Sequence, residues 1–188
     1  MSRRATLAVT VVIPLLAACS PQTGQAELGG RIEPLCHEPN EALILIAQTV
    51  QSATQLPCVA GYPAGWSYGG DDFRKGSAIY YLDSAIAGPN AVEVQLVPSC
   101  EATGEPTDAP EGIEGSASTN STGETRWFEF DGGCIVQTIA LGSASDDGGL
   151  ADEAELTLGF FDRAELAAAL QDDYGVTLCG AGAEPCAG

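Results

Sequence analysis

The stretch GSAIYYLDSAIAGPNAVEVQLV, residues 76–97, decides the fold of this chain. Residues 76–83 are rich in aromatic and β-branched side chains, a composition typical of a strand. In residues 91–97, apolar side chains alternate with Glu and Gln, which predicts a strand with one buried face. The Ala-Gly-Pro-Asn sequence at 87–90 is a turn. The two strands are therefore expected to form an antiparallel hairpin.

A second hairpin is predicted further along the chain. Residues 125–130 and 134–141 are two strand-like runs on either side of an Asp-Gly-Gly turn at 131–133. Between the hairpins, residues 101–124 contain two prolines, four glycines and a Ser/Thr run. This composition indicates a long, mobile surface loop. The two hairpins together predict an antiparallel sheet of about four strands.

A helix is predicted before the first hairpin. Asn40 is a good N-cap for a helix over residues 42–50, and Glu41 suits the positive end of the helix dipole. The apolar run LILIA inside this segment also fits a buried strand, because short apolar runs are ambiguous. Residues 55–70 are rich in Pro and Gly and are expected to form a loop.

Helices are also predicted at the C-terminal end. Residues 150–160 have helical spacing. Asp162, with an acidic residue three positions later, is the expected N-cap of a helix over residues 164–174. Gly175 fits the position just after that helix. Strands flanked by helices at both ends predict an α+β fold with an antiparallel sheet.

The first 18 residues have the three parts of an export signal. Arg3 and Arg4 give a positive start, and residues 8–18 form an apolar run of eleven residues. That run is too short to cross a bilayer, which needs about 20 residues. The closing sequence Leu-Ala-Ala-Cys at 16–19 resembles the bacterial lipoprotein motif. The resemblance implies cleavage before Cys19 and a diacylglyceryl group on its sulfur.

The alternative is an ordinary signal peptide in which Cys19 is incidental.

Two acyl chains on Cys19 would hold the protein stably at the membrane. We therefore expect it on the extracytoplasmic face of the cell membrane, with the membrane contacted through the lipid. Residues 19–33 comprise the lipidated cysteine and a polar, Gly-containing flexible tether. Residues 34–188 suit a single extracytoplasmic domain.

The cysteine count agrees with export. The chain has seven cysteines, so assigning Cys19 to the lipid leaves an even number. Six cysteines in an exported domain imply a disulfide framework with 15 possible connectivities. Short loops close at the lowest entropic cost, so three local pairings are favoured: Cys36–Cys58, Cys100–Cys134 and Cys179–Cys186.

Acidic residues dominate the composition. The chain has 26 acidic and 7 basic residues, a formal net charge of −19. Nucleic-acid binding needs clustered basic side chains, and beyond the signal only Arg74 and Lys75 are adjacent. No nucleic-acid partner is expected. The adjacent acidic pairs do not fit a calcium-binding loop, so neither metal nor cofactor is assigned to them: Asp71-Asp72, Asp146-Asp147 and Asp172-Asp173.

The sequence GWSYG at 65–69 matches the G-x-S-x-G motif of hydrolases, which places the nucleophile Ser67 between a strand and a helix. A histidine later in the chain should act as the base. The chain's single histidine, His37, precedes the motif, and Pro- and Gly-rich turns are expected around Ser67. We interpret the motif as a turn whose aromatic side chains pack on the first hairpin, and no catalytic residue is assigned.

Residues 36–141 resemble an uncharacterised group of actinobacterial envelope proteins. The resemblance implies an envelope location and carries no activity over to this chain. It rests on AQTV at 47–50, LPCVAGYPAGWSYGGDDFRKGSAIYYLDS at 56–84, AVEVQL at 91–96 followed by Cys100, and FDGGC at 130–134.

Two functions remain open at this point. The first is a binding domain that contacts another envelope protein or polymer, through its sheet or through a candidate patch formed by Trp66, Tyr68 and Phe73. The second is a hydrolase that acts on envelope polymers with two carboxylates about 5–9.5 Å apart in a cleft. An exposed aromatic patch favours the first function, and a cleft with paired carboxyl groups favours the second.

Lipidation is directly testable. Cys19→Ala should block lipid modification and cleavage, because the thioether cannot form without the sulfur. Ser20→Ala, one residue later, should leave both intact. Mass spectrometry of the wild-type protein should find a mature chain that starts at a modified Cys19. An unmodified, water-soluble wild-type protein that starts at another residue would contradict the prediction.

Overall fold

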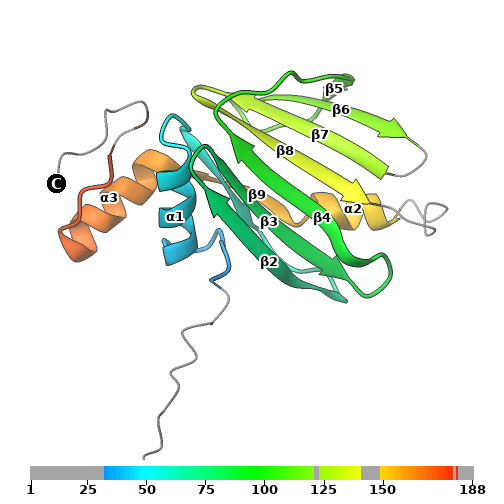
Figure 1. Cartoon of the computed structure of the whole chain (residues 1–188), viewed down its shortest axis with the longest axis horizontal. Coiled ribbons are helices and arrows are strands. Elements are labelled where there is room, and N and C mark those ends of the chain that lie inside the picture. The colour runs from blue at the N-terminus through cyan, green and yellow to red at the C-terminus, as the bar shows by residue number, and fades with distance from the viewer. Residues whose placement is uncertain (1–31, 121–122, 141–148, 180, 182–188) are drawn as a thin grey trace, which may run out of the picture. The chain divides into compact units, whose positions relative to one another are not determined.

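A seven-stranded antiparallel sheet is the largest element of the structure (Figure 1). The computed structural model describes residues 32–120, 123–140, 149–179 and 181. The strand order is β2-β3-β4-β8-β7-β6-β5. The bounds are β2 (Trp66–Arg74), β3 (Ser77–Ser84), β4 (Gly88–Val97), β5 (Glu105–Thr107), β6 (Glu114–Asn120), β7 (Gly123–Phe130) and β8 (Gly133–Ala140).

The remaining elements form a layer beside this sheet. Two strands from distant parts of the chain pair antiparallel, with Leu56 opposite Phe161. The helices α1 and α3 lie side by side at one end of the large sheet (Figure 1). The bounds are α1 (Glu41–Thr49), β1 (Gln55–Val59), α2 (Gly149–Glu155), β9 (Leu158–Asp162) and α3 (Arg163–Tyr174).

Both predicted hairpins are confirmed. β3 and β4 pair with Tyr80 opposite Val94, and β7 and β8 pair with Phe128 opposite Ile135. The predicted caps are confirmed as well: Asn40 caps α1, and Asp162 caps α3. The antiparallel sheet and flanking helices of the predicted fold are thus present, while the estimate of about four strands is wrong.

Residues 55–70, expected to be a loop, contain β1 and the start of β2. Pro57 has no N–H group to donate. It is tolerated because β1 pairs with a single strand, β9, along this part of its length, so no second strand needs a hydrogen bond from Pro57. In β2, the register shifts between Tyr68 and Gly70. This β-bulge accommodates the two consecutive glycines within an edge strand of the sheet.

Residues 101–124, interpreted as a loop, contain β5, β6 and the start of β7. The sequence of β6, EGSASTN, has no hydrophobic alternation, because β6 lies near the sheet edge and buries little side-chain surface. Its pairing with β7 is nevertheless continuous from Glu114 to Asn120. The helix predicted over residues 150–160 is too long: α2 ends at Glu155, and residues 158–162 form β9.

The core lies on one face of the large sheet. Alternate residues of the central strands point to this face and are buried, including Tyr80 and Leu82 in β3, Val94 in β4 and Ile135 in β8. Side chains of α1, among them Leu43, belong to the same cluster. The predicted alternation of residues 91–97 therefore marks the covered face.

Two of the three favoured disulfides are present. Cys36–Cys58 joins the segment before α1 to β1, and Cys100–Cys134 joins the end of β4 to β8. The first packs against Gly159 in β9, where a Cβ atom would overlap the sulfur of Cys36. Cys179 is also disulfide-bonded. Cys186 lies outside the described residues, so the pairing Cys179–Cys186 stays a prediction.

A buried arginine connects the N-terminal and C-terminal parts of the layer. Arg163 follows β9, and its backbone N–H donates to Thr54 O at 2.9 Å. Its Nη1 donates to Ala47 O at 2.8 Å and to Val50 O at 3.4 Å, at the C-terminal end of α1. Its Nε and Nη2 donate to Cys179 O. Burial lowers the pKa of this guanidinium, and the negative end of the α1 dipole favours its charged form.

None of the helices in the described part of the chain combines the length and the apolar composition that crossing a membrane requires.

Arg163→Met should destabilise the domain strongly. The substitution removes the donor to the buried carbonyl of Ala47 and to the half-buried carbonyl of Cys179, and a buried group left unpaired costs about 1–3 kcal/mol. We expect the free energy of unfolding in urea to fall by about 3 kcal/mol. Arg74→Met removes an exposed arginine and should change it far less. Equal effects of the two substitutions would contradict this role of Arg163.

Candidate functional site

The predicted aromatic patch is not a surface patch. Trp66 is 7% exposed and Tyr68 is 4% exposed, and both belong to the core. Phe73 is partly buried and packs against the same core. The physical reason is the alternation of β2, which directs Trp66 and Tyr68 to the covered face of the sheet. This site prediction is therefore corrected: these three residues do not form an exposed binding surface.

The two buried aromatic residues have polar partners instead. Trp66 Nε1 donates to Glu153 Oε2 at 3.0 Å and thereby joins β2 to α2. The hydroxyl of Tyr68 donates to Asp71 Oδ2 at 2.9 Å. Burial, followed by this hydrogen bond, raises the pKa of Tyr68 above its usual value. Both interactions are structural, because the polar ends of buried aromatic side chains need partners.

Ser67 has the opposite orientation. It is exposed on β2 and lies opposite Asp83 of β3. The strand continues through Ser67 to Arg74, so the motif does not form the strand-to-helix turn of a nucleophile elbow. His37 is exposed, and its Nε2 lies 3.3 Å from Glu38.

The acidic pairs are placed separately. Asp71 accepts the hydrogen bond from Tyr68, whereas Asp72 lies 2.6 Å from Arg74 Nη2. Asp172 and Asp173 are exposed on α3, and Asp146-Asp147 lies outside the described residues. Within the described ranges, no three metal-ligating side chains come together.

Carboxylates do converge at Arg126. Its Nε donates to Glu124, its neighbour on β7, and its Nη1 lies 2.8 Å from Glu155 Oε2 at the end of α2. The side chain of Arg126 is largely buried. A guanidinium between two carboxylates forms an ion-pair network that ties α2 to the sheet. It does not present the two carboxyl groups as a free acid and base pair.

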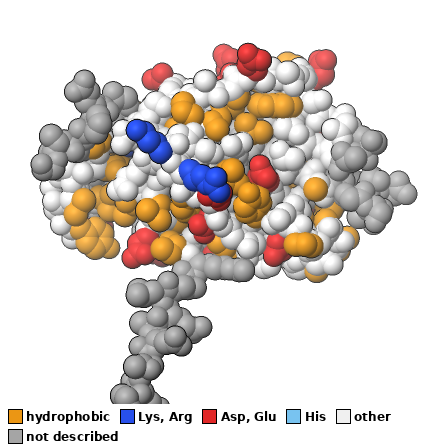
Figure 2. Space-filling view, in the orientation of Figure 1, with side chains coloured by type: hydrophobic (Ala, Val, Ile, Leu, Met, Phe, Trp, Pro, Cys, Tyr) orange, Lys and Arg blue, Asp and Glu red, His pale blue; other side chains and the backbone are white. Residues whose placement is uncertain are grey.

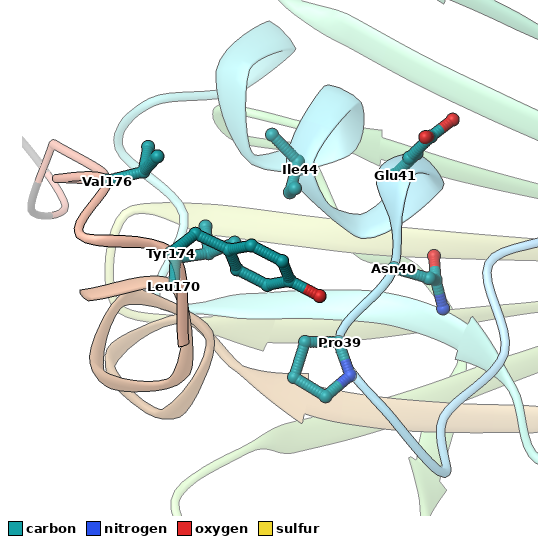
Figure 3. A pocket seen from close by; sticks show the side chains of 7 residues that line it. All are labelled: Pro39, Asn40, Glu41, Ile44, Leu170, Tyr174 and Val176. Atoms are coloured by element: carbon teal, nitrogen blue, oxygen red, sulfur yellow. The ribbon is translucent and has the colours of Figure 1, made fainter. Parts of the chain in front are cut away.

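A groove of apolar character lies between α1 and α3 (Figure 3). Its volume is about 460 Å³, which lies in the range of small-molecule and anchor-residue sites. Tyr174 and Val176 are 73% and 52% exposed, although both are large hydrophobic residues. The lining residues are Pro39, Asn40, Glu41, Ile44, Leu170, Tyr174 and Val176.

Helix caps on both sides position the groove. Asn40 Oδ1 accepts from Leu43 N at 3.1 Å, and its Nδ2 donates to Leu35 O. This double role fixes the entry into α1. At the end of α3, Gly175 has φ +63°, and Val176 N donates to Leu170 O at 3.2 Å. The chain therefore reverses after the helix and returns Val176 to the groove wall.

Sequence reasoning identified both caps but missed the groove. Ile44 and Leu170 looked like ordinary helix core residues, and nothing in the sequence showed that α1 and α3 are neighbours. The available signal was the position of Tyr174 and Val176 on either side of the capping Gly175. Apolar residues on both sides of a helix end contact something, either the same helix or another surface.

The groove has an acidic residue in its wall, Glu41. The basic side chains visible in Figure 2 lie in the half of this face that also holds α1. Of the basic residues in the described ranges, Arg126 and Arg163 are buried. A cationic group on a partner would complement Glu41 in the groove wall.

No protein-family model matches the chain, and no curated protein or solved structure is significantly similar to it.

We expect Ser67 and Trp66 to respond differently to truncation. Trp66→Ala should lower the free energy of unfolding by about 3–5 kcal/mol, as for other buried Trp residues. Ser67→Ala changes an exposed residue and should stay within about 0.5 kcal/mol. Urea unfolding measures both, and a fluorophosphonate probe should leave Ser67 unlabelled. Stoichiometric labelling of Ser67 would make it a nucleophile and contradict our interpretation.

Proposed function

We propose that this protein is a lipid-anchored extracytoplasmic binding protein. The lipid on Cys19 holds it at the cell membrane, and the groove between α1 and α3 receives an apolar side chain of another envelope protein. The lipoprotein motif at residues 16–19 supports the location. The groove supports the binding function, and it is the observation that carries the proposal.

Isolated exposed hydrophobic residues are normal on protein surfaces. The groove differs because two exposed apolar side chains, Tyr174 and Val176, stand around a hollow of about 460 Å³. Ile44 and Leu170 line the same hollow. Well-packed pockets that take one aromatic or aliphatic anchor are typical of the energetic centres of interfaces.

The charge around the groove specifies the partner further. Glu41 in the groove wall should favour an anchor residue that is flanked by Lys or Arg, since complementary charges speed association and suppress wrong partners. The proposed partner is therefore an envelope protein with an exposed segment of one or two apolar residues beside basic ones.

Site-specific photo-crosslinking tests this proposal in native cell envelopes. A photoreactive residue at position 174 should give one discrete adduct. The same residue at Ile86, which is 72% exposed in the β3–β4 turn, should not. Val176→Asp should reduce the adduct at position 174 by at least about tenfold, because it places a charge in the apolar wall.

The crosslinked segment of the partner should also have the expected amino-acid sequence. Peptide mapping should place the crosslink on a protein segment with an apolar residue next to Lys or Arg. Equal crosslinking at positions 174 and 86, or attachment to lipid or to an acidic segment, would contradict the proposed binding function. Lipidation is tested independently through Cys19, so the two parts of the proposal fail separately.

A further inference from the structure

The face of the large sheet that points away from the core carries two regular rows of side chains. We call it the open face. Successive side chains of a strand point to opposite faces, so the residues next to the buried Tyr80, Val94 and Ile135 lie on the open face. The strand registers align these residues into rows that run across the strands.

The first row is polar. Each member lies opposite the next one, from β3 across β4, β8 and β7 to β6. At about 4.8 Å between neighbouring strands, the row is about 19 Å long. Among the described residues, none of its side chains makes a hydrogen bond, so its hydroxyl groups and its carboxylate can contact a ligand. The members are Tyr81, Glu93, Thr138, Thr125 and Ser118.

The second row lies two residues further along the strands and is mainly apolar. Ile79 lies opposite Gln95, which lies opposite Val136, and Val136 lies opposite Trp127. All four side chains are partly exposed. Gln95 Nε2 donates to Ser77 Oγ at 3.0 Å, which leaves its carbonyl oxygen for a ligand. Contiguous apolar side chains on an exposed face mark interaction surfaces more often than scattered ones do.

A glycan strand has the pattern that matches these two rows. Its sugar rings present C–H faces, which pack on aromatic and aliphatic side chains, and its hydroxyl groups donate and accept hydrogen bonds. Laid across the strands, it would place ring faces on Trp127 and Val136 and hydroxyl groups along the polar row. An extended peptide matches less well, because its backbone groups pair with a sheet edge rather than with a sheet face.

The charge of the open face selects among glycans. Glu93 lies between Tyr81 and Thr138 in the polar row, and among the described residues its carboxylate has no basic partner. Arg74, on the edge strand β2, is already paired with Asp72, with 2.6 Å between Nη2 and Oδ2. An unpaired carboxylate repels anionic polymers and attracts the ammonium group of an amino sugar.

We infer that the open face binds a glycan strand that contains free amino sugars. The ammonium group of one sugar pairs with Glu93, hydroxyl groups of its neighbours bond to the rest of the polar row, and ring faces pack on Trp127 and Val136. This inference goes beyond the proposed partner binding, because the site takes a polysaccharide and shares no residue with the α1–α3 groove.

Isothermal titration calorimetry of the full lipidated chain, in non-ionic detergent at physiological salt, tests this inference. The probe is a β-1,4-linked hexamer of glucosamine in mildly acidic buffer, where its amines are protonated. It should bind, and the N-acetylated hexamer should bind about tenfold more weakly, because it lacks the charge. An oligomer of galacturonate, which is anionic, should not bind measurably.

Variants with matched controls locate the site. Glu93→Gln should abolish the preference for the glucosamine hexamer, whereas Glu165→Gln, exposed on α3, should leave the preference unchanged. Thr138→Lys places a cation in the polar row at an exposed position and should abolish binding. Ala168→Lys, the same change of charge on α3, should not. Trp127→Ala should weaken binding of both hexamers severalfold, because it removes the aromatic surface.

The inference is overturned if the glucosamine hexamer does not bind, or if it binds Thr138→Lys as it binds the wild type. It is also overturned if Glu165→Gln acts like Glu93→Gln, because the acidic domain as a whole would then attract the amines. Equally tight binding of a hexapeptide of alternating Lys and Leu would make the open face a protein-binding surface and overturn the inference as well.

Discussion

The pairing of β1 with β9 is the constraint on which the rest of the structure depends. These strands are about one hundred residues apart in the sequence, and Gln55 lies opposite Asp162. Immediately after this pair, Arg163 donates to carbonyls at the end of α1 and to Cys179. Without this pairing, α1 and α3 would not be held next to each other. The core face of the large sheet would then be exposed to water.

The groove follows from where this covering layer ends. At one end, α1 and α3 meet through their caps and leave the apolar groove. At the other end, β9 begins after α2, and the seven-stranded sheet extends beyond β9 into β7 and β6. Gln137 lies under that boundary, where the layer supplies Ala154 O for its Nε2 and nothing for its Oε1. A seven-stranded sheet covered by a narrower layer has such boundaries as a geometric consequence.

The sequence predicted what is local and amphipathic. The strand over residues 91–97 alternates because it is central and half buried, and Asn40 and Asp162 act within one helical turn. The other strands depend on distant partners: β6 has small polar residues that need only β7 beside them, and β2 contains a Gly-Gly bulge. For the same reason, Trp66 looked like part of an exposed loop, although Glu153, 87 residues later, receives its N–H. The groove combines segments whose proximity has no local signal in the sequence.

Native-state hydrogen exchange measures the role of the β1–β9 pair most directly. If this pair holds the covering layer on the sheet, the amides of β1 and β9 should exchange with the same opening free energy as those of β3 and β4. All four strands should then respond equally to low urea concentrations, as one cooperative unit. Exchange of β1 and β9 at a clearly lower free energy, while β3 and β4 stay protected, would contradict the account.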